Sequence, residues 1–91
     1  MNSFGSYIRE KREGLHADDK SKSLRQVAIA IGVEPAFLSK VERDIVSPPS
    51  EGKIIALAEV LNEDPDLLLA MAGKVSSDLL AIVKARPQLI G

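Results

Sequence analysis

Apolar residues recur along this chain at the three- and four-residue spacing of amphipathic helices. The clearest stripe falls at positions i, i+3, i+4 and i+7 and comprises Leu24, Val27, Ala28 and Ile31. Ser23 precedes this stripe and Gln26 lies three residues further on, which is the spacing of a capping box at a helix start. We therefore predict a helix over residues 24–31.

A tight turn and a second helix follow directly. Gly32 ends the first helix, because only glycine enters the left-handed conformation of a helix stop without steric cost. Pro35 suits the first turn of a new helix, where its missing N–H is no loss. In a helix over residues 35–43, Leu38 and Val41 point inward, and the outward positions are Pro35, Ala36, Phe37, Ser39, Lys40 and Arg43. This order of elements is typical of a DNA-binding helix-turn-helix.

Flanking segments complete an all-helical pattern. We predict a first helix from Ser3 to about Glu13, with Gly14 as its stop and an inner side formed by Phe4, Ile8 and Leu15. Residues 15–22 are polar and are expected to form a mobile surface loop. Ser50 is expected to cap a fourth helix over residues 51–61, whose inner stripe is Ile54, Leu57, Ala58 and Leu61.

Two further helices are predicted towards the C-terminus. Asp64 as N-cap and Pro65 at the first helical position begin a fifth helix, which Gly73 ends. A sixth helix runs from Ser76 or Ser77 to about Arg86, and its apolar residues Leu79, Leu80, Ile82 and Val83 are too numerous for one buried side. This helix either covers the domain's own core or forms a self-association surface. We favour a dimer interface within residues 67–90, and divide the chain into a domain (1–73) and a C-terminal extension (74–91).

Composition narrows the class of protein. The chain has 91 residues, enough for one small domain, with 45% apolar and only 3% aromatic residues, so aliphatic side chains must fill the core. There is no cysteine, which excludes disulfides and thiolate metal sites. The sequence contains neither an apolar run of membrane-spanning length nor a signal peptide, so we expect a cytoplasmic protein without a membrane partner.

Charge is distributed unevenly between the two halves. Residues 1–43 hold eight Lys and Arg against six Asp and Glu, whereas residues 44–91 hold four against seven. The basic half contains the helix-turn-helix pattern, which supports a nucleic-acid partner.

Enzymatic chemistry has no support in the sequence. There is no nucleophile, histidine and acid set, no metal-ligand spacing and no phosphate-binding glycine loop. His16 is expected to be a solvated surface residue. We predict no catalytic or metal site, no cofactor and no small-molecule substrate.

The run A-x-x-x-G-V-x-x-x-x-L-S-K-V-E-R, from Ala28 to Arg43, resembles the Cro and lambda-repressor type of helix-turn-helix, also called Xre-like. The flanks F-G-x-x-I-R-E-x-R-E, from Phe4, and S-P-P-S-E-x-K-I-x-x-L-A-E-V-L, from Ser47, resemble the same family, as does E-D-P-D-x-L-L from Glu63. The resemblance covers residues 4–73. It implies a compact all-α domain of five to six helices, lambda-repressor-like, in a transcriptional regulator of bacterial or phage origin.

The resemblance also implies a partner and its contacts. The expected partner is double-stranded operator DNA, a palindrome bound by a homodimer, with repression by promoter occlusion as the mode of action. Base contacts would come from Ala36, Phe37, Ser39 and Lys40. Phosphate contacts would come from Arg9, Arg12, Ser23, Arg25, Arg43 and Lys53. An ion pair between Arg12 and Glu42 would hold the first helix to the end of the third.

Several departures from the family pattern keep a second function open. Leu24 replaces the usual glutamine, Asp44 replaces the usual glycine, and residues 45–49 lack Lys and Arg. Phe37 is equally compatible with a core position. The alternative is an antitoxin-like or partner-binding protein-interaction module that keeps the fold but binds DNA weakly or not at all.

Overall fold

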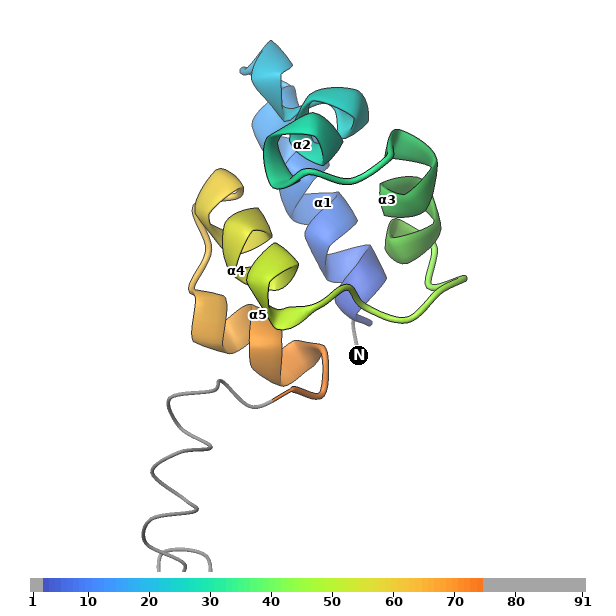
Figure 1. The fold of residues 1–91 in the computed structure, drawn as a ribbon. Coiled ribbons are helices and arrows are strands. Elements are labelled where there is room, and N and C mark those ends of the chain that lie inside the picture. Colours follow the sequence, from blue (N-terminus) through green and yellow to red (C-terminus); the bar gives the residue numbers. More distant parts are fainter. Residues whose placement is uncertain (1–2, 75–91) are drawn as a thin grey trace, which may run out of the picture.

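The computed structural model of the protein describes residues 3–74, which form an all-α domain without a strand in that range (Figure 1). The elements are α1 (Phe4–His16), the 3₁₀ helix η1 (Lys20–Lys22), α2 (Leu24–Ile31), α3 (Pro35–Glu42), α4 (Glu51–Val60) and α5 (Pro65–Met71). The predicted all-α class is thus confirmed. The expected sixth helix and the interface residues Leu79, Leu80, Ile82 and Val83 lie outside the described residues.

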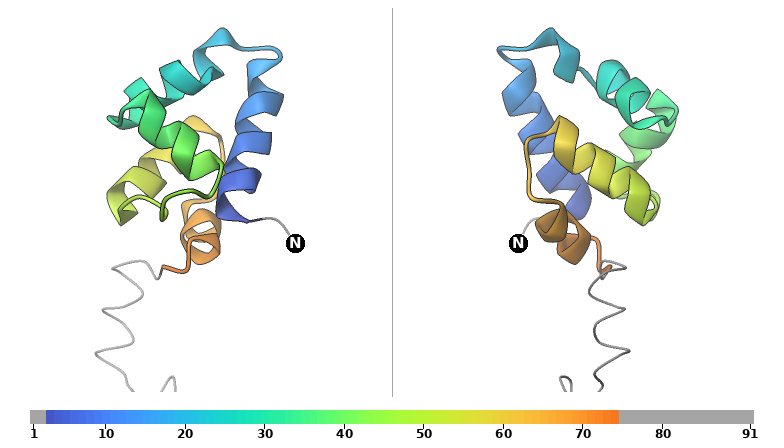
Figure 2. Two further views of the ribbon diagram at one scale, coloured as in Figure 1. Left: turned by 90° about the vertical axis from the view of Figure 1, so that its right-hand side faces the viewer. Right: turned by 60° about the vertical axis from the view of Figure 1, so that its left-hand side comes forward.

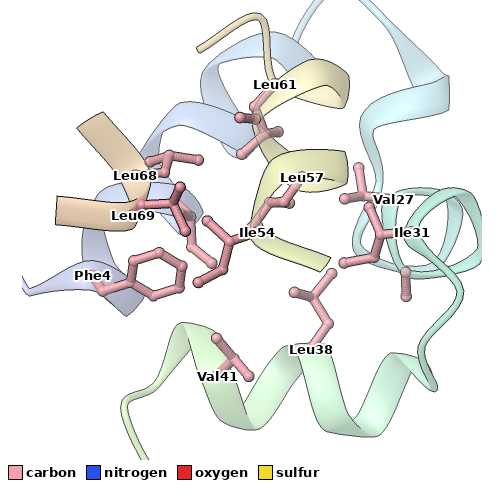
Figure 3. Packing of buried hydrophobic residues seen from close by; sticks show 13 residues of the cluster. Phe4, Val27, Ile31, Leu38, Val41, Ile54, Leu57, Leu61, Leu68 and Leu69 are labelled. Atoms are coloured by element: carbon pink, nitrogen blue, oxygen red, sulfur yellow. The ribbon is translucent and has the colours of Figure 1, made fainter. Parts of the chain in front are cut away.

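One apolar core joins all five α-helices. Ile54 and Leu57 of α4 lie at its centre, between the side chains of α5 and those of α2 (Figure 3). The buried apolar members are Phe4, Ile8, Val27, Ala28, Ile31, Leu38, Val41, Ile54, Leu57, Ala58, Leu61, Leu68 and Leu69. The stripe predicted for α4 is completely buried, whereas Leu24 at the start of the α2 stripe is only half-buried.

Local side-chain chemistry sets several helix ends as predicted. The Ser23 hydroxyl accepts a hydrogen bond from the Gln26 N–H at 3.2 Å, and Asp64 Oδ1 accepts one from the Asp66 N–H at 2.9 Å. Gly32 follows α2 in the left-handed conformation, with φ 77°. Ser50 occupies the N-cap position of α4, but its side chain forms no capping hydrogen bond.

The first helix is longer than predicted. It continues through Gly14 to His16, although Gly14 was expected to end it. A glycine inside a helix costs only about 1 kcal/mol relative to alanine, so the packing of Leu15 against the core is sufficient to extend the helix. Leu15 is half-buried rather than enclosed, and the third inward position of α1 is taken by Arg12.

The polar segment expected to be a mobile loop is largely helical. Its first residues belong to α1, and its last form η1. Asp19 Oδ1 caps η1 by accepting hydrogen bonds from the Ser21 N–H at 2.9 Å and from the Ser21 hydroxyl at 2.7 Å. These two hydrogen bonds hold the pKa of Asp19 below its ordinary value.

The start of α1 lies against the end of α3. Gly5 is buried there, and the two helices are so close that a Cβ atom at this position would clash with the backbone carbonyl oxygen of Val41. Asp44 follows α3 in the left-handed region, with φ 58°. Its carboxylate accepts hydrogen bonds from the Gly5 N–H at 3.0 Å and from the Ser3 hydroxyl at 2.5 Å. The C-terminal side of α3 is therefore attached to the N-terminus of α1.

Candidate nucleic-acid interface

The turn between α2 and α3 is fixed by backbone hydrogen bonds. The Val33 N–H donates to the Ala28 carbonyl at 2.9 Å, and the Gly32 N–H donates to the Ile29 carbonyl at 3.1 Å. Lys53 of α4 donates from its Nζ to the Gly32 carbonyl at 3.3 Å, so the turn is also attached to α4. The two views of Figure 2 show α2 and α3 as consecutive helices that cross at an angle, as in a helix-turn-helix.

The inner side of α3 is held by apolar packing and by one buried ion pair. Leu38 and Val41 are enclosed in the core. Glu42 accepts two hydrogen bonds from Arg12, from Nε to Oε2 at 2.7 Å and from Nη2 to Oε1 at 3.0 Å. This bidentate geometry connects α1 to the last turn of α3, as the resemblance implied. Arg12 Nη1 also donates to the Lys22 carbonyl at 3.3 Å, which ties η1 to the same point.

Arg12 is not available for the phosphate contact predicted for it, because it is buried and paired with Glu42. It is only 7% exposed, and Glu42 is only 6% exposed. To reach a DNA phosphate, Arg12 would have to leave Glu42. The Glu42 carboxylate would then be buried without a partner, at a high cost in free energy. Its role in this structure is to hold α3 in position.

The outward side of α3 presents a small mixed surface. Ala36, Lys40 and Arg43 are exposed, while Ser39 is half-buried. The Lys40 ammonium makes no hydrogen bond or ion pair with any residue in the range 3–74. Arg43 Nε donates to the Ser39 carbonyl at 3.2 Å, so its guanidinium lies back along the last turn of α3.

Phe37 belongs in part to the core. Its side chain is half-buried and packs against the enclosed cluster, which favours the core alternative for this residue. The side chain is therefore only partly accessible to a partner. The exposed members of the predicted base-contacting set are therefore Ala36 and Lys40.

The predicted phosphate contacts fall at different points around this surface. Arg9 and Arg25 are exposed, and Arg9 lies 3.6 Å from Glu13 in an i, i+4 ion pair. Ser23 is half-buried and uses its hydroxyl as the α2 cap. A hollow of about 150 Å³ lies between α1, α2 and α3. It is lined by Arg9, Arg12, Glu13, Leu24, Ser39, Glu42 and Arg43. The fold thus brings Arg9 and Arg43 to one hollow, whereas Arg25 and Lys53 lie outside it.

A second hollow lies on the opposite side of α1. It has a volume of about 410 Å³ and is lined by Tyr7, Glu10, Lys11, Gly14 and Leu15. The Tyr7 hydroxyl donates a hydrogen bond of 2.6 Å to Glu63 Oε2. This bond raises the pKa of Tyr7 and lowers the pKa of Glu63, because it stabilises the protonated phenol and the ionised carboxylate together.

Other kinds of site are not formed by the described residues. Within the range 3–74, no three His, Asp or Glu side chains are grouped so that they could hold a metal ion. No helix in that range is both long and apolar enough to cross a bilayer.

Comparison with known proteins agrees with this geometry. Residues 3–71 match the model of a family described as helix-turn-helix domain. No match was found among the curated proteins or among the solved structures. Domains of this family typically bind DNA and are not enzymes. The match spans α1 to α5, including the fixed turn and the exposed side of α3, and this chain therefore belongs to the helix-turn-helix domain family.

Proposed function

We propose that the protein is a sequence-specific DNA-binding transcriptional regulator of the Cro and lambda-repressor (Xre-like) type, which represses by occluding a promoter. The observation that carries this proposal is the asymmetry of α3. Its inner side is fixed by Leu38, Val41 and Glu42, whereas Ala36 and Lys40 on its outer side are exposed. A helix held rigidly from behind and exposed in front is suited to the major groove.

Each exposed group has a matching partner on DNA. Lys40 is suited to guanine, whose O6 and N7 are both acceptors in the major groove. The Ala36 methyl group is suited to the methyl group of thymine, and the Ser39 hydroxyl can donate or accept. Phosphate contacts would come from Arg9, Arg25, Arg43 and Lys53. With so few base contacts, phosphate contacts and DNA shape would supply much of the affinity.

We propose a homodimer as the binding form. Residues 1–73 would be the DNA-binding domain and residues 74–91 the extension that contributes to dimerisation within 67–90. Leu67 on α5 supports this assignment, because it is 42% exposed at the edge of the described domain. A two-fold axis would place the two α3 helices about 34 Å apart, in successive major grooves of a palindrome. The site of action would be the bacterial cytoplasm.

Selection from a random double-stranded DNA pool at low salt tests the proposal. We expect the wild-type protein to enrich a palindromic motif, and the double variant Lys40→Ala, Arg43→Ala to lose it. As a control, Lys11→Ala removes a cation in the hollow on the opposite side of α1 and should keep the motif. If the wild type enriches no motif, or if Lys40→Ala, Arg43→Ala binds unchanged, the proposal is wrong.

A protein-interaction module is the second candidate, and exposed apolar residues favour it. Ile29 on α2 is 57% exposed, and Ile45 after α3 is 59% exposed, so both flank the helix-turn-helix. Residues 45–49 contain no cation for a phosphate. This candidate predicts no enriched DNA motif but loss of a protein complex in Ile29→Ser and Ile45→Ser, which size-exclusion chromatography would detect.

A further inference from the structure

Glu34 lies at the start of α3, and its carboxylate has no partner among residues 3–74. It is the N-cap residue of α3, but its side chain makes no capping hydrogen bond. The side chain is exposed and forms no ion pair with any residue from 3 to 74. Most N-cap residues are short and accept a hydrogen bond from the helix N–H groups, and this glutamate does not provide that hydrogen bond.

The backbone of Glu34 is nevertheless held firmly. The fixed turn at Gly32 precedes it, and the proline ring of Pro35 restricts φ immediately after it. The Glu34 carbonyl accepts a hydrogen bond from the Leu38 N–H at 3.1 Å, which closes the first turn of α3. The carboxylate is therefore carried on a preorganised backbone two residues before Ala36, at the end of α3 that approaches base edges in a helix-turn-helix.

Resting on the proposed DNA-binding function, we propose that Glu34 is a specificity-determining residue that selects a cytosine in each half-site. A carboxylate brought between phosphates is repelled unless a base donates a hydrogen bond to it. In the major groove, only the amino groups of cytosine and adenine donate. Adenine also places the acceptor N7 beside its amino group, which repels the second carboxylate oxygen, so cytosine is the preferred partner.

The same chemistry excludes the other bases. Guanine presents two acceptors in the major groove and thymine presents one, so each would face the carboxylate with like partial charge. Glu34 would act partly by rejecting wrong sites, in addition to stabilising the right one. A correct contact of this kind changes affinity about tenfold relative to the wrong base.

A purely structural alternative assigns Glu34 to the helix dipole. A negative charge at a helix N-terminus is favourable, whatever lies opposite it. That role would change thermal stability when the charge is removed, but it would leave base preference unaltered. Base preference therefore distinguishes the two roles.

The test is binding-site selection with the wild type, Glu34→Gln and Glu34→Ala, with Glu59→Gln as the control for loss of one acidic charge on α4. We expect the wild type to enrich cytosine at one position of each half-site. Glu34→Gln should move that preference to adenine, which a carboxamide bonds at N6 and N7, and Glu34→Ala should lose the preference at that position alone. Glu59→Gln should give the wild-type motif.

Affinity measurements complete the design. Replacing the selected cytosine should weaken wild-type binding about tenfold and should have little effect on Glu34→Ala. A wild-type motif that the Glu34 variants reproduce at every position would overturn the assignment of Glu34 and leave the proposed function standing. Absence of any motif in the wild type would overturn both.

Discussion

The carboxylate of Asp44 and the backbone N–H of Gly5 form a 3.0 Å hydrogen bond across 39 residues of sequence. Asp44 lies in the left-handed region, which an aspartate tolerates at some cost in free energy. That cost is offset because the carboxylate caps α1, whose first N–H groups have no partner within the helix. The end of α3 and the start of α1 are therefore stabilised by one side chain.

Removing this cap should destabilise the domain. We expect Asp44→Ala to lower the free energy of unfolding by about 1–2 kcal/mol, because it loses the cap and keeps the left-handed backbone. For a domain of this size, 1 kcal/mol corresponds to a fall in Tm of about 4–8 °C. Asp18→Ala, at an exposed site, is the control and should stay within about 0.5 kcal/mol of wild type in thermal unfolding. Equal Tm values for the two variants would contradict this role.

Replacing glycine by alanine should change the stability of the domain in opposite directions at two positions of α1. Gly5→Ala places a methyl group against the Val41 carbonyl oxygen and about 2.5 Å from Asp44 Oδ1. This substitution should lower the free energy of unfolding by about 1–3 kcal/mol. Gly14→Ala meets nothing within 4 Å and lies inside the helix, so it should stabilise by about 0.5–1 kcal/mol. Urea denaturation of both variants measures the two signs. A stable Gly5→Ala protein would show that the two helices are not in close contact.

Replacing one partner of the buried Arg12 and Glu42 pair should lower the free energy of unfolding far more than breaking an exposed pair. Arg12→Met leaves the Glu42 carboxylate buried and unpaired, and should cost about 3–5 kcal/mol. The double variant Arg12→Met, Glu42→Leu removes both charges and should recover most of that loss. As a control, Arg9→Met breaks only the exposed pair with Glu13 and should change stability by less than about 1 kcal/mol. A double variant no more stable than Arg12→Met would count against this account.

The Tyr7 and Glu63 hydrogen bond should make stability depend on pH at both extremes. The pKa of Glu63 is lowered, so its contribution is present above the ordinary value of 4.5 and is lost as pH falls through the folded-state pKa. The pKa of Tyr7 is raised, so its contribution is present below the ordinary value of 10.0 and is lost as pH rises through the folded-state pKa.

Tyr7→Phe should remove both contributions. We expect this variant to be less stable than wild type between about pH 5 and about pH 9, and the difference to shrink beyond either limit. Thermal unfolding across the pH range measures the difference. A constant difference at all pH values would show that Tyr7 acts through packing alone.

Salt dependence should separate the cations proposed to contact phosphate from the other cations. Each phosphate contact contributes about 0.9 to the slope of log affinity against log salt concentration. Each subunit of the bound dimer would lose one such contact in Arg25→Ala, so the slope should fall by about 1.8. Lys11→Ala, in the hollow on the opposite side of α1, should leave the slope unchanged. Fluorescence anisotropy at several salt concentrations gives both slopes, and equal slopes would remove Arg25 from the proposed contacts.

Local patterns in the sequence were sufficient for the features that local chemistry determines. The α4 stripe, the Gly32 turn and the Asp64 cap each depend on residues within one or two turns of one another. The continuation of α1 beyond Gly14 could not be predicted, because it depends on packing against elements distant in sequence.

In the candidate site, too, local features could be predicted from the sequence, whereas features that depend on distant residues could not. Helix periodicity correctly separated Leu38 and Val41 from Ala36 and Lys40. It could not decide the position of Phe37, at the margin of the apolar stripe, nor could it show that Arg12 is unavailable to DNA. The capping role of Asp44 was missed because its partners, Ser3 and Gly5, are about 40 residues away and carry no signal that connects them.

The anchoring of α3 from one side has an evolutionary consequence. Among the described residues, the side chains of Ala36 and Lys40 form no hydrogen bond or ion pair and are not part of the enclosed core. Substitutions at these two positions can therefore accumulate with little penalty to folding, while Gly5, Arg12 and Glu42 stay constrained. Duplicated copies of such a domain could diverge towards new DNA targets while sharing one unchanged scaffold.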